Sequence, residues 1–344
     1  MANRIFYAVQ QVAIGPDTAD TFQVVKGVQS VSMTTTFNLE QAFELGQLEI
    51  YENIEGVPNI EMTINRLMDG TALLYVLASA TSNSDAYSRA DDINLASQNN
   101  SVIKLGIWDE GIRSFAQTAT NPNNQVTVSG AVMSNVTYTM GVDGNFTEEV
   151  SFTATDKAWY SSDCTNGHWA ESLEAGAFDG TDGPKFAGGV QRRQFFRTDG
   201  PSSTALPSVI PEGLARLQSV TVSADFGRED LFQLGQKGPF AKVATFPLEV
   251  TCSIDVLSSG GDRVNALAES CTAGSTCDTA GNLSDETIIV ELCDGTVIDL
   301  GTKNKLSSVS YGGGDAGGGN VTTTFDFVTF NKLSVSGTGT VSFA

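Results

Sequence analysis

The sequence predicts a mainly β protein with one helix per module, an α+β class, built from two tandem β-sandwich or partial-barrel modules. Three observations predict it: a long internal repeat, polar and apolar residues alternating with period two, and turns rich in glycine and aspartate. Residues 28–47 and 217–236 align without a gap at an offset of 189, and nine of the twenty positions are identical. Average residue usage would give roughly one or two identities by chance. A period this long excludes a solenoid and indicates two similar domains in tandem.

The aligned segment begins with a predicted strand that has one buried face. In the first copy the apolar residues Val31, Met33 and Phe37 alternate with serine and threonine, and Val220 and Phe226 keep this phase in the second copy. Because a slip of one residue would exchange the two faces, the preserved phase predicts a preserved fold.

The remaining elements follow in the same order in both copies. A charged loop and a second alternating strand come first, then a helix, a short apolar strand with an acidic turn, and a hairpin. The long loops are residues 38–58 and 227–247, the helices 69–80 and 261–270, the short strands 103–111 and 288–295, and the hairpins 134–152 and 307–327. Each module is therefore expected to have four main strands with one helix against their apolar face.

Domain boundaries follow from where the two copies correspond. We expect a first module over residues 1–158, a linker or surface insertion over 159–188, and a second module over 189–344. The middle segment has no counterpart in the first copy and is rich in glycine, aspartate and serine, as loops are.

Composition limits the function. Nineteen Lys and Arg against 40 Asp and Glu give a net charge of −21, so the chain should repel nucleic acid rather than bind its phosphates. No signal-peptide pattern and no long apolar run is present, which predicts a protein made in the cytosol without a membrane partner. With five cysteines out of metal-ligand spacing and the single histidine His168, we predict no catalytic, cofactor-binding or metal-binding residues, and hence no enzyme.

The polar face of the predicted strands carries charges of one sign. No Lys or Arg falls on it in the assigned phase, whereas an ordinary solvated face mixes both signs. Hydroxyls and carboxylates alone suit a channel that passes a polyanion; a merely soluble outer face is the alternative. The acidic residues assigned to this face are Glu61, Glu149, Asp225, Glu249, Asp255 and Asp326.

The order of elements, the FELGQ sequence at residues 43–47 and the SNVTYTMGVDGNFTE hairpin resemble the tail tube proteins of long-tailed bacteriophages. The resemblance covers both modules and implies a virion subunit, assembled in the host cytoplasm, that closes into rings by edge-to-edge strand pairing. The rings would stack through the long loops into a hollow tube with an acidic lumen. That tube would conduct DNA during ejection without binding it specifically. Expected partners are further copies, tail terminator and baseplate proteins, and a sheath if the tail is contractile.

The duplication departs from the commonest pattern of that family. If six modules close a ring and each chain supplies two, three chains form a trimer with pseudo-sixfold symmetry; a hexamer is the alternative. We expect the contacts between rings to involve Glu44, Glu49, Glu52 and Glu55. A trimeric baseplate hub or distal tail protein is the nearest competing identity, and a surface β-sandwich binding protein is a more distant one.

Overall fold

The computed structural model describes most of both predicted modules. The described residues are 5, 10–17, 22–80, 84–89 (backbone only), 93, 99–108, 122–161, 189–197, 204–210, 216–258, 264, 285–314 and 319–342 (338–342 backbone only). The greater part of the predicted insertion and of the second predicted helix lies outside them, as do His168 and Cys164.

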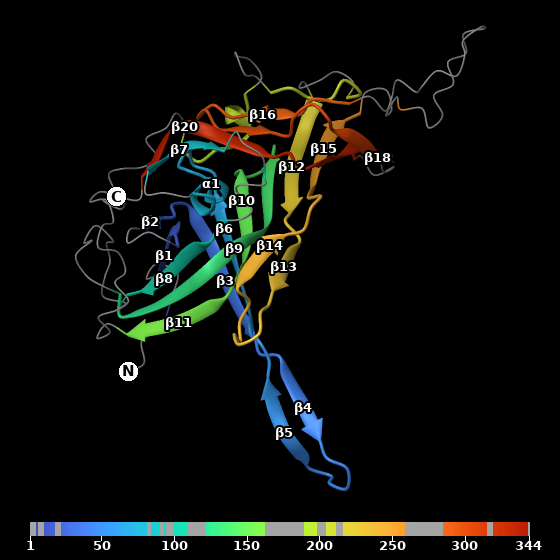
Figure 1. Cartoon of the computed structure of the whole chain (residues 1–344). Helices are drawn as coiled ribbons and strands as arrows, with labels where there is room; N and C mark the ends of the chain where they lie inside the picture. Colours follow the sequence, from blue (N-terminus) through green and yellow to red (C-terminus); the bar gives the residue numbers. More distant parts are fainter. Residues whose placement is uncertain are drawn as a thin grey trace.

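Eight antiparallel strands form one continuous, open sheet (Figure 1). Four come from the second repeat and four from the first, so the two modules share a single sheet. The mainly β fold is confirmed, and within the single chain this sheet is not closed into a barrel. In sheet order the strands are β18 (Lys305–Gly312), β19 (Thr322–Phe330), β15 (Glu249–Leu257), β12 (Leu217–Asp225), β9 (Asn124–Gly141), β10 (Thr147–Ala154), β6 (Asn59–Leu67) and β3 (Val28–Thr36).

The two halves of this sheet repeat each other in detail. β3 corresponds to β12, β6 to β15, β10 to β19, and the end of β9 to β18, in the same spatial order. One extra residue interrupts the pairing at matching places: Gln29 in β3 and Gln218 in β12, then Ser134 in β9 and Ser307 in β18. A β-bulge is a specific local feature, so four bulges in two matched pairs extend the repeat well beyond its aligned sequence.

β9 is long because it belongs to two layers. Its second half lies in the eight-stranded sheet, and its first half pairs with β8 (Ser101–Ile107) and β11 (Asp156–Ser161). Gly130 sits between the halves with φ of +60°, and a Cβ there would lie 2.2 Å from the hydroxyl of Thr155. Only glycine fits this bend without strain. β1 (Gln10–Pro16) and β2 (Gln23–Val24) complete this group beyond β8.

A second sheet contains strands from both modules. Its order is β16–β17–β20–β7, and β7 comes from the first module whereas the other three come from the second. The first module thus contributes one strand to a sheet that otherwise belongs to the second module. The strands are β16 (Ile289–Glu291), β17 (Val297–Asp299), β20 (Ser334–Ser342) and β7 (Ser84–Arg89).

Residues 189–197 also tie the modules together. The Gln191 N–H donates to the carbonyl of Met68 at 2.7 Å, and the Phe146 N–H donates to the Gln191 carbonyl at 2.8 Å. Arg197 then forms an ion pair with Glu291 of its own chain at 2.8 Å. The segment at the start of the second module is therefore bonded to both modules within the chain.

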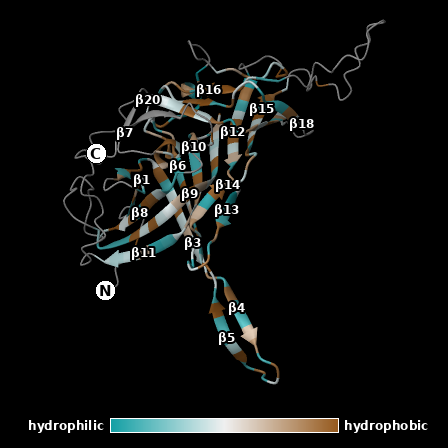
Figure 2. Ribbon diagram, in the orientation of Figure 1, coloured by the Kyte–Doolittle hydropathy of each residue, from teal (hydrophilic) through white to brown (hydrophobic). Residues whose placement is uncertain are grey.

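Alternation along the strands separates a buried apolar face from a polar face, as predicted. Figure 2 shows brown and teal alternating along β12 and β15. Val220, Val250 and Phe325 are fully buried, and their register partners continue the core across both modules. This single core runs beneath the whole sheet.

The helix α1 (Leu74–Ala78) is shorter than the predicted 69–80 but lies where expected, against the apolar side of the sheet. No side chain of its own caps its start. Instead, the buried Glu148 of β10 accepts the N–H of Leu74 at 2.8 Å and that of Tyr75 at 3.1 Å. These are backbone groups that a helix cannot satisfy internally. The hydroxyl of Tyr138 donates to the same carboxylate at 3.2 Å.

Burial raises the pKa of the Glu148 carboxyl above its ordinary value, while Arg66 and the donated hydrogen bonds oppose that rise. The Arg66 Nε lies 3.8 Å from the Glu148 carboxylate. A raised carboxyl pKa means that the folded state holds the proton more tightly than the unfolded chain. The contribution of Glu148 to stability is thus greatest at low pH and is lost as the pH rises through its folded pKa.

The long loops were predicted without regular structure, and this prediction is wrong. The first forms a hairpin of β4 (Leu39–Phe43) and β5 (Ile50–Glu55) that extends away from the body, and the second forms a shorter hairpin of β13 (Arg228–Leu231) and β14 (Ala241–Ala244) (Figure 1). Both turns use the repeated Leu-Gly-Gln sequence. Gly46 and Gly235 there have φ of +94° and +91°, which explains why glycine occurs in both copies.

Candidate assembly interface

The junction between the two modules is an antiparallel pairing of β12 with β9. It runs from Ser219 opposite Gly141 to Asp225 opposite Asn135 without a break. On the polar face the hydroxyls of Ser223 and Thr137 lie 3.0 Å apart. The N–H of Phe226 donates to the carbonyl of Ser134 and prolongs the ladder. The chain therefore contains one complete example of how an edge of the second module joins an edge of the first.

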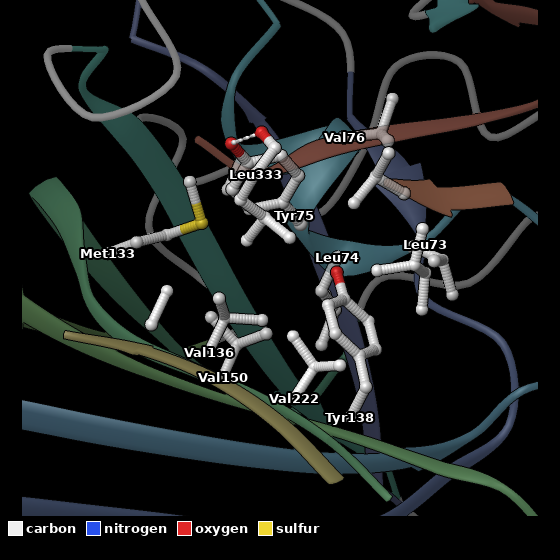
Figure 3. Packing of buried hydrophobic residues seen from close by; sticks show 14 of the residues in the cluster. Leu73, Leu74, Tyr75, Val76, Met133, Val136, Tyr138, Val150, Val222 and Leu333 are labelled. Atoms are coloured by element: carbon white, nitrogen blue, oxygen red, sulfur yellow. Dashed lines mark hydrogen bonds between the residues drawn. The ribbon is translucent and has the colours of Figure 1, made fainter. Parts of the chain in front are cut away.

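Aromatic packing secures this junction on the apolar side. Phe226, directly after β12, lies with its ring 6.4 Å from that of Tyr75 in α1, at an interplanar angle of 26°. Arg228 lies 5.4 Å from the centre of the Phe226 ring, and its Nε donates to the carbonyl of Met133 on β9 at 2.5 Å. The Tyr75 hydroxyl donates to the carbonyl of Leu333 in the second module (Figure 3). The first module's helix thus contacts the second module directly.

The two outer edges of the sheet are the repeat counterparts of this junction. β3 corresponds to β12 and pairs with β6 alone, and β18 corresponds to the end of β9 and pairs with β19 alone, among the strands that the structure describes. One outer edge of the sheet therefore corresponds to β12 and the other to β9, the two strands that pair at the internal junction. Such a heterologous pair of surfaces can join identical copies into a ring or a filament.

Side-chain exposure distinguishes the used edges from the outer ones. Phe226 is 0% exposed, whereas Phe37, its partner in the repeat, is 71% exposed. Tyr138 is 0% exposed, whereas its partner Tyr311 is 53% exposed. Met33 is only partly buried, whereas the corresponding Val222 is 1% exposed. Both outer edges thus present apolar side chains that a neighbouring module covers at the internal junction.

The expectation that Phe37 lies on a buried strand face is therefore wrong for the single chain. Phe37 follows the end of β3, and no described element takes the place that α1 has over Phe226. An alternating pattern marks which side of a strand is apolar. It does not indicate whether the element that packs over that side belongs to the same chain.

The six acidic residues assigned to the polar face occupy strand positions that alternate with the buried apolar positions. Their partners are hydroxyls and amides rather than cations. Asp255 accepts from Ser219 and Thr324 at 2.5 Å each, and Asp326 accepts from Ser253 at 2.7 Å. In the same way Glu149 accepts from Asn65 at 3.0 Å, Glu61 from Asn59 at 2.8 Å, and Asp225 from the Gly227 N–H at 2.9 Å, while Glu249 is exposed at the start of β15.

Two basic residues occur in the eight strands. Arg66 is buried on the opposite face, where its guanidinium donates to Asp69 at 3.0 Å. Lys305 stands at the first position of β18, which begins two residues before the predicted hairpin, and forms an ion pair with Asp285 at 2.8 Å. The polar face is thus acidic except at this margin.

The four glutamates assigned to ring contacts all lie on the first hairpin and are exposed. Glu44 and Glu49 belong to its turn region, and Glu52 and Glu55 to β5. Glu55 lies 3.6 Å from Lys237 of the second hairpin, an exposed pair of little energetic weight. Sequence reasoning overlooked the apolar residues beside them: Leu45, Leu48 and Leu234 are fully exposed at the two tips.

Other site types find no support in the described part of the chain. It contains no group of three or more His, Cys, Asp or Glu side chains placed to hold a metal ion. None of its helices is long and apolar enough to cross a membrane.

No protein-family model matches the sequence, and no curated protein matches it. Solved structures that align with part of the chain include the baseplate of the anti-feeding prophage, the tube-terminating cap of the same system, and the PVC sheath–tube complex of an extracellular contractile injection system. Their identities are 11%, 13% and 11%, and their TM-scores 0.33, 0.34 and 0.32. Each alignment covers 47–48% of this chain and 93–100% of the other. Because these TM-scores are low, the functional conclusion rests on the geometry of this chain.

The paired phenylalanines give a direct test of the difference between the edges. Phe226→Ala should lower the free energy of unfolding by about 3–5 kcal/mol, because it empties a filled site in the core. Phe37→Ala should change it by less than about 0.5 kcal/mol in the isolated chain, because that side chain is exposed. Urea denaturation of dilute protein measures both. Equal costs for the two variants would contradict the assignment of Phe37 to an uncovered edge.

Proposed function

We propose that this chain is a structural subunit of a phage-like tail, in which three copies close into a ring and rings stack into a hollow tube. The observation that carries this proposal is the match between the internal junction and the outer edges. Phe37 and Tyr311 are exposed where Phe226 and Tyr138 are buried. Pairing β3 of one copy with β18 of the next would cover both and leave no edge of the eight-stranded sheet open.

Closing the ring would also determine whether the polar face points inward or outward. α1 and the second sheet cover the apolar face of the eight strands, so that side of the wall is thick. In a closed barrel the thick side faces outward, and the uncovered polar face lines the bore. The six carboxylates would then repel DNA phosphates along its path, so that DNA passes without being held.

The proposal extends to location and partners. The ring would belong to the tail of a virion, be assembled in the host cytoplasm, and meet terminator, baseplate and, in a contractile tail, sheath proteins at its ends and outer surface. The exposed leucines of the hairpin tips would supply apolar contact between rings, with Glu44, Glu49, Glu52 and Glu55 around them. No catalytic step is part of this function.

A trimeric hub at the tail tip is the second candidate. The longer β4–β5 hairpin and the shorter β13–β14 hairpin would alternate around a trimer, so the face that they form has threefold rather than sixfold symmetry. Such a face suits a threefold partner. Negative-stain microscopy separates the two, because a hub would remain as isolated trimers whereas a tube protein forms long hollow filaments.

The internal junction predicts the register between copies. Ser223 faces Thr137 there, so the repeat places Thr34 of one copy opposite Ser310 of the next. The Thr34→Cys/Ser310→Cys variant should form disulfides between chains and give a covalent species of three chains on a non-reducing gel. A series that ends at six chains would instead support the hexamer.

Two further double-cysteine variants are controls for this cross-linking experiment. Ser223→Cys/Thr137→Cys should cross-link within the chain at any concentration, because these hydroxyls lie 3.0 Å apart. Thr34→Cys/Ser308→Cys should cross-link poorly, because it pairs diagonal positions about 7–8 Å apart. Cys252 can stay, since burial raises the pKa of its thiol to about 12. The other native cysteines, Cys164, Cys271, Cys277 and Cys293, would be replaced by serine.

The leucine tips test stacking separately from ring closure. Leu45→Ser/Leu48→Ser should leave the unfolding free energy of the single chain within about 0.5 kcal/mol of wild type, because both residues are fully exposed. Rings should still form, but tubes should be short or absent by electron microscopy. Tubes of normal length would show that the first hairpin does not hold rings together. Replacing the four hairpin glutamates by glutamine tests their share in the same assay.

The polar face is tested with DNA. Tubes of a Glu61→Lys/Asp225→Lys/Glu249→Lys variant should assemble and retain duplex DNA in co-sedimentation at low salt, with release as salt rises. Wild-type tubes should not retain it. Glutamine at the same three positions is the matched control, because it removes the negative charges without adding cations. Lysine tubes that retain no DNA would contradict a bore-lining face.

A further inference from the structure

β20 of the second module has strands on both of its sides. One side pairs with β17, and the other pairs with β7 of the first module, from Val335 opposite Arg89 to Ser342 opposite Ser84. The outer layer of the second module is therefore completed by a strand from the adjacent module, across the β12–β9 junction. This exchange is a second connection between modules, separate from the pairing in the main sheet (Figure 1).

β11 holds in the first module the place that β20 holds in the second. β11 follows β10 and pairs with the first half of β9, just as β20 follows β19 and pairs with β17. Register identifies matching residues: Leu105, Val126 and Trp159 lie side by side across β8, β9 and β11. Across β16, β17 and β20 the corresponding residues are Val290, Ile298 and Val335.

The matching residues differ in exposure as the main-sheet edges do. Val335, between β17 and β7, is 0% exposed, whereas Trp159 is 54% exposed. β11 pairs with β9 and with no other described strand. The Lys157 ammonium donates to the hydroxyl of Thr35 on β3, so the β11 edge adjoins the outer edge of the main sheet. A copy that pairs with β3 would therefore also lie next to β11.

We infer that the outer edge of β11 binds a strand donated by the second module of a neighbouring copy of this chain, which covers Trp159. The donated strand would repeat between copies what β7 does for β20 within one chain. This inference rests on the proposed ring but goes beyond it, because β3–β18 pairing could close a ring without any exchange of strands. Each copy would then be held to the next by two separate ladders of backbone hydrogen bonds.

Hydrogen exchange measured by mass spectrometry on the ring and monomer fractions tests the inference. Peptides that cover β3, β18 and β11 should all exchange at least about tenfold more slowly in the ring. If β3 and β18 gain protection and β11 does not, the exchange of strands is wrong and the ring stands. If none of the three gains protection, the proposed ring fails and this inference fails with it.

A variant supplies the second measurement. Trp159→Ala should raise the protein concentration at which half of the rings dissociate by about tenfold, because it removes a large buried contact. The fold of the single chain should be unaffected, and Thr34→Cys/Ser310→Cys disulfides should still form in rings at high concentration. Phe330→Ala is the matched control, because Phe330 is equally exposed at 53% but lies at the end of β19, away from β11. Equal dissociation of the two variants would overturn the inference.

Discussion

The pairing of β12 with β9 is the interaction on which the rest of the structure depends. It joins two four-stranded halves into one sheet, places Phe226 beneath Tyr75, and brings β7 within reach of β20. A sheet cannot satisfy the backbone groups of its outermost strands from within. By using one edge of each module, the junction leaves the other two exposed at opposite ends of the same chain.

Much of the fold could be predicted because its signals are local. The strand phase around Val31 and Val220, the turn glycines and the order of elements all follow from residues near one another in sequence. The joining of the modules could not be predicted this way, since β12 and β9 show the same alternation whatever strand lies beside them. The buried position of Glu148 could not be predicted, because an acidic residue in a strand indicates solvent exposure and only the fold brings the start of α1 to it.

The candidate interface could likewise be predicted only in part. Strand phase places Glu61, Asp225 and Asp326 on the polar face, because successive side chains along one strand point to opposite faces of the sheet. Assigning Phe37 to the core failed, because cover from another module is invisible in sequence. The two hairpins could not be predicted from the strand pattern, because β4 and β5 lack a period-two alternation of polar and apolar residues.

The covalent link between the modules has a kinetic and thermodynamic consequence. Because β12 and β9 belong to one chain, their effective concentration stays fixed however dilute the protein becomes. In a three-chain ring this leaves half of the module junctions permanently formed, and only the other half respond to concentration. Assembly would then start from a preformed pair rather than from single modules, and the two modules of the pair are free to diverge in sequence. The unequal hairpins show that they have done so.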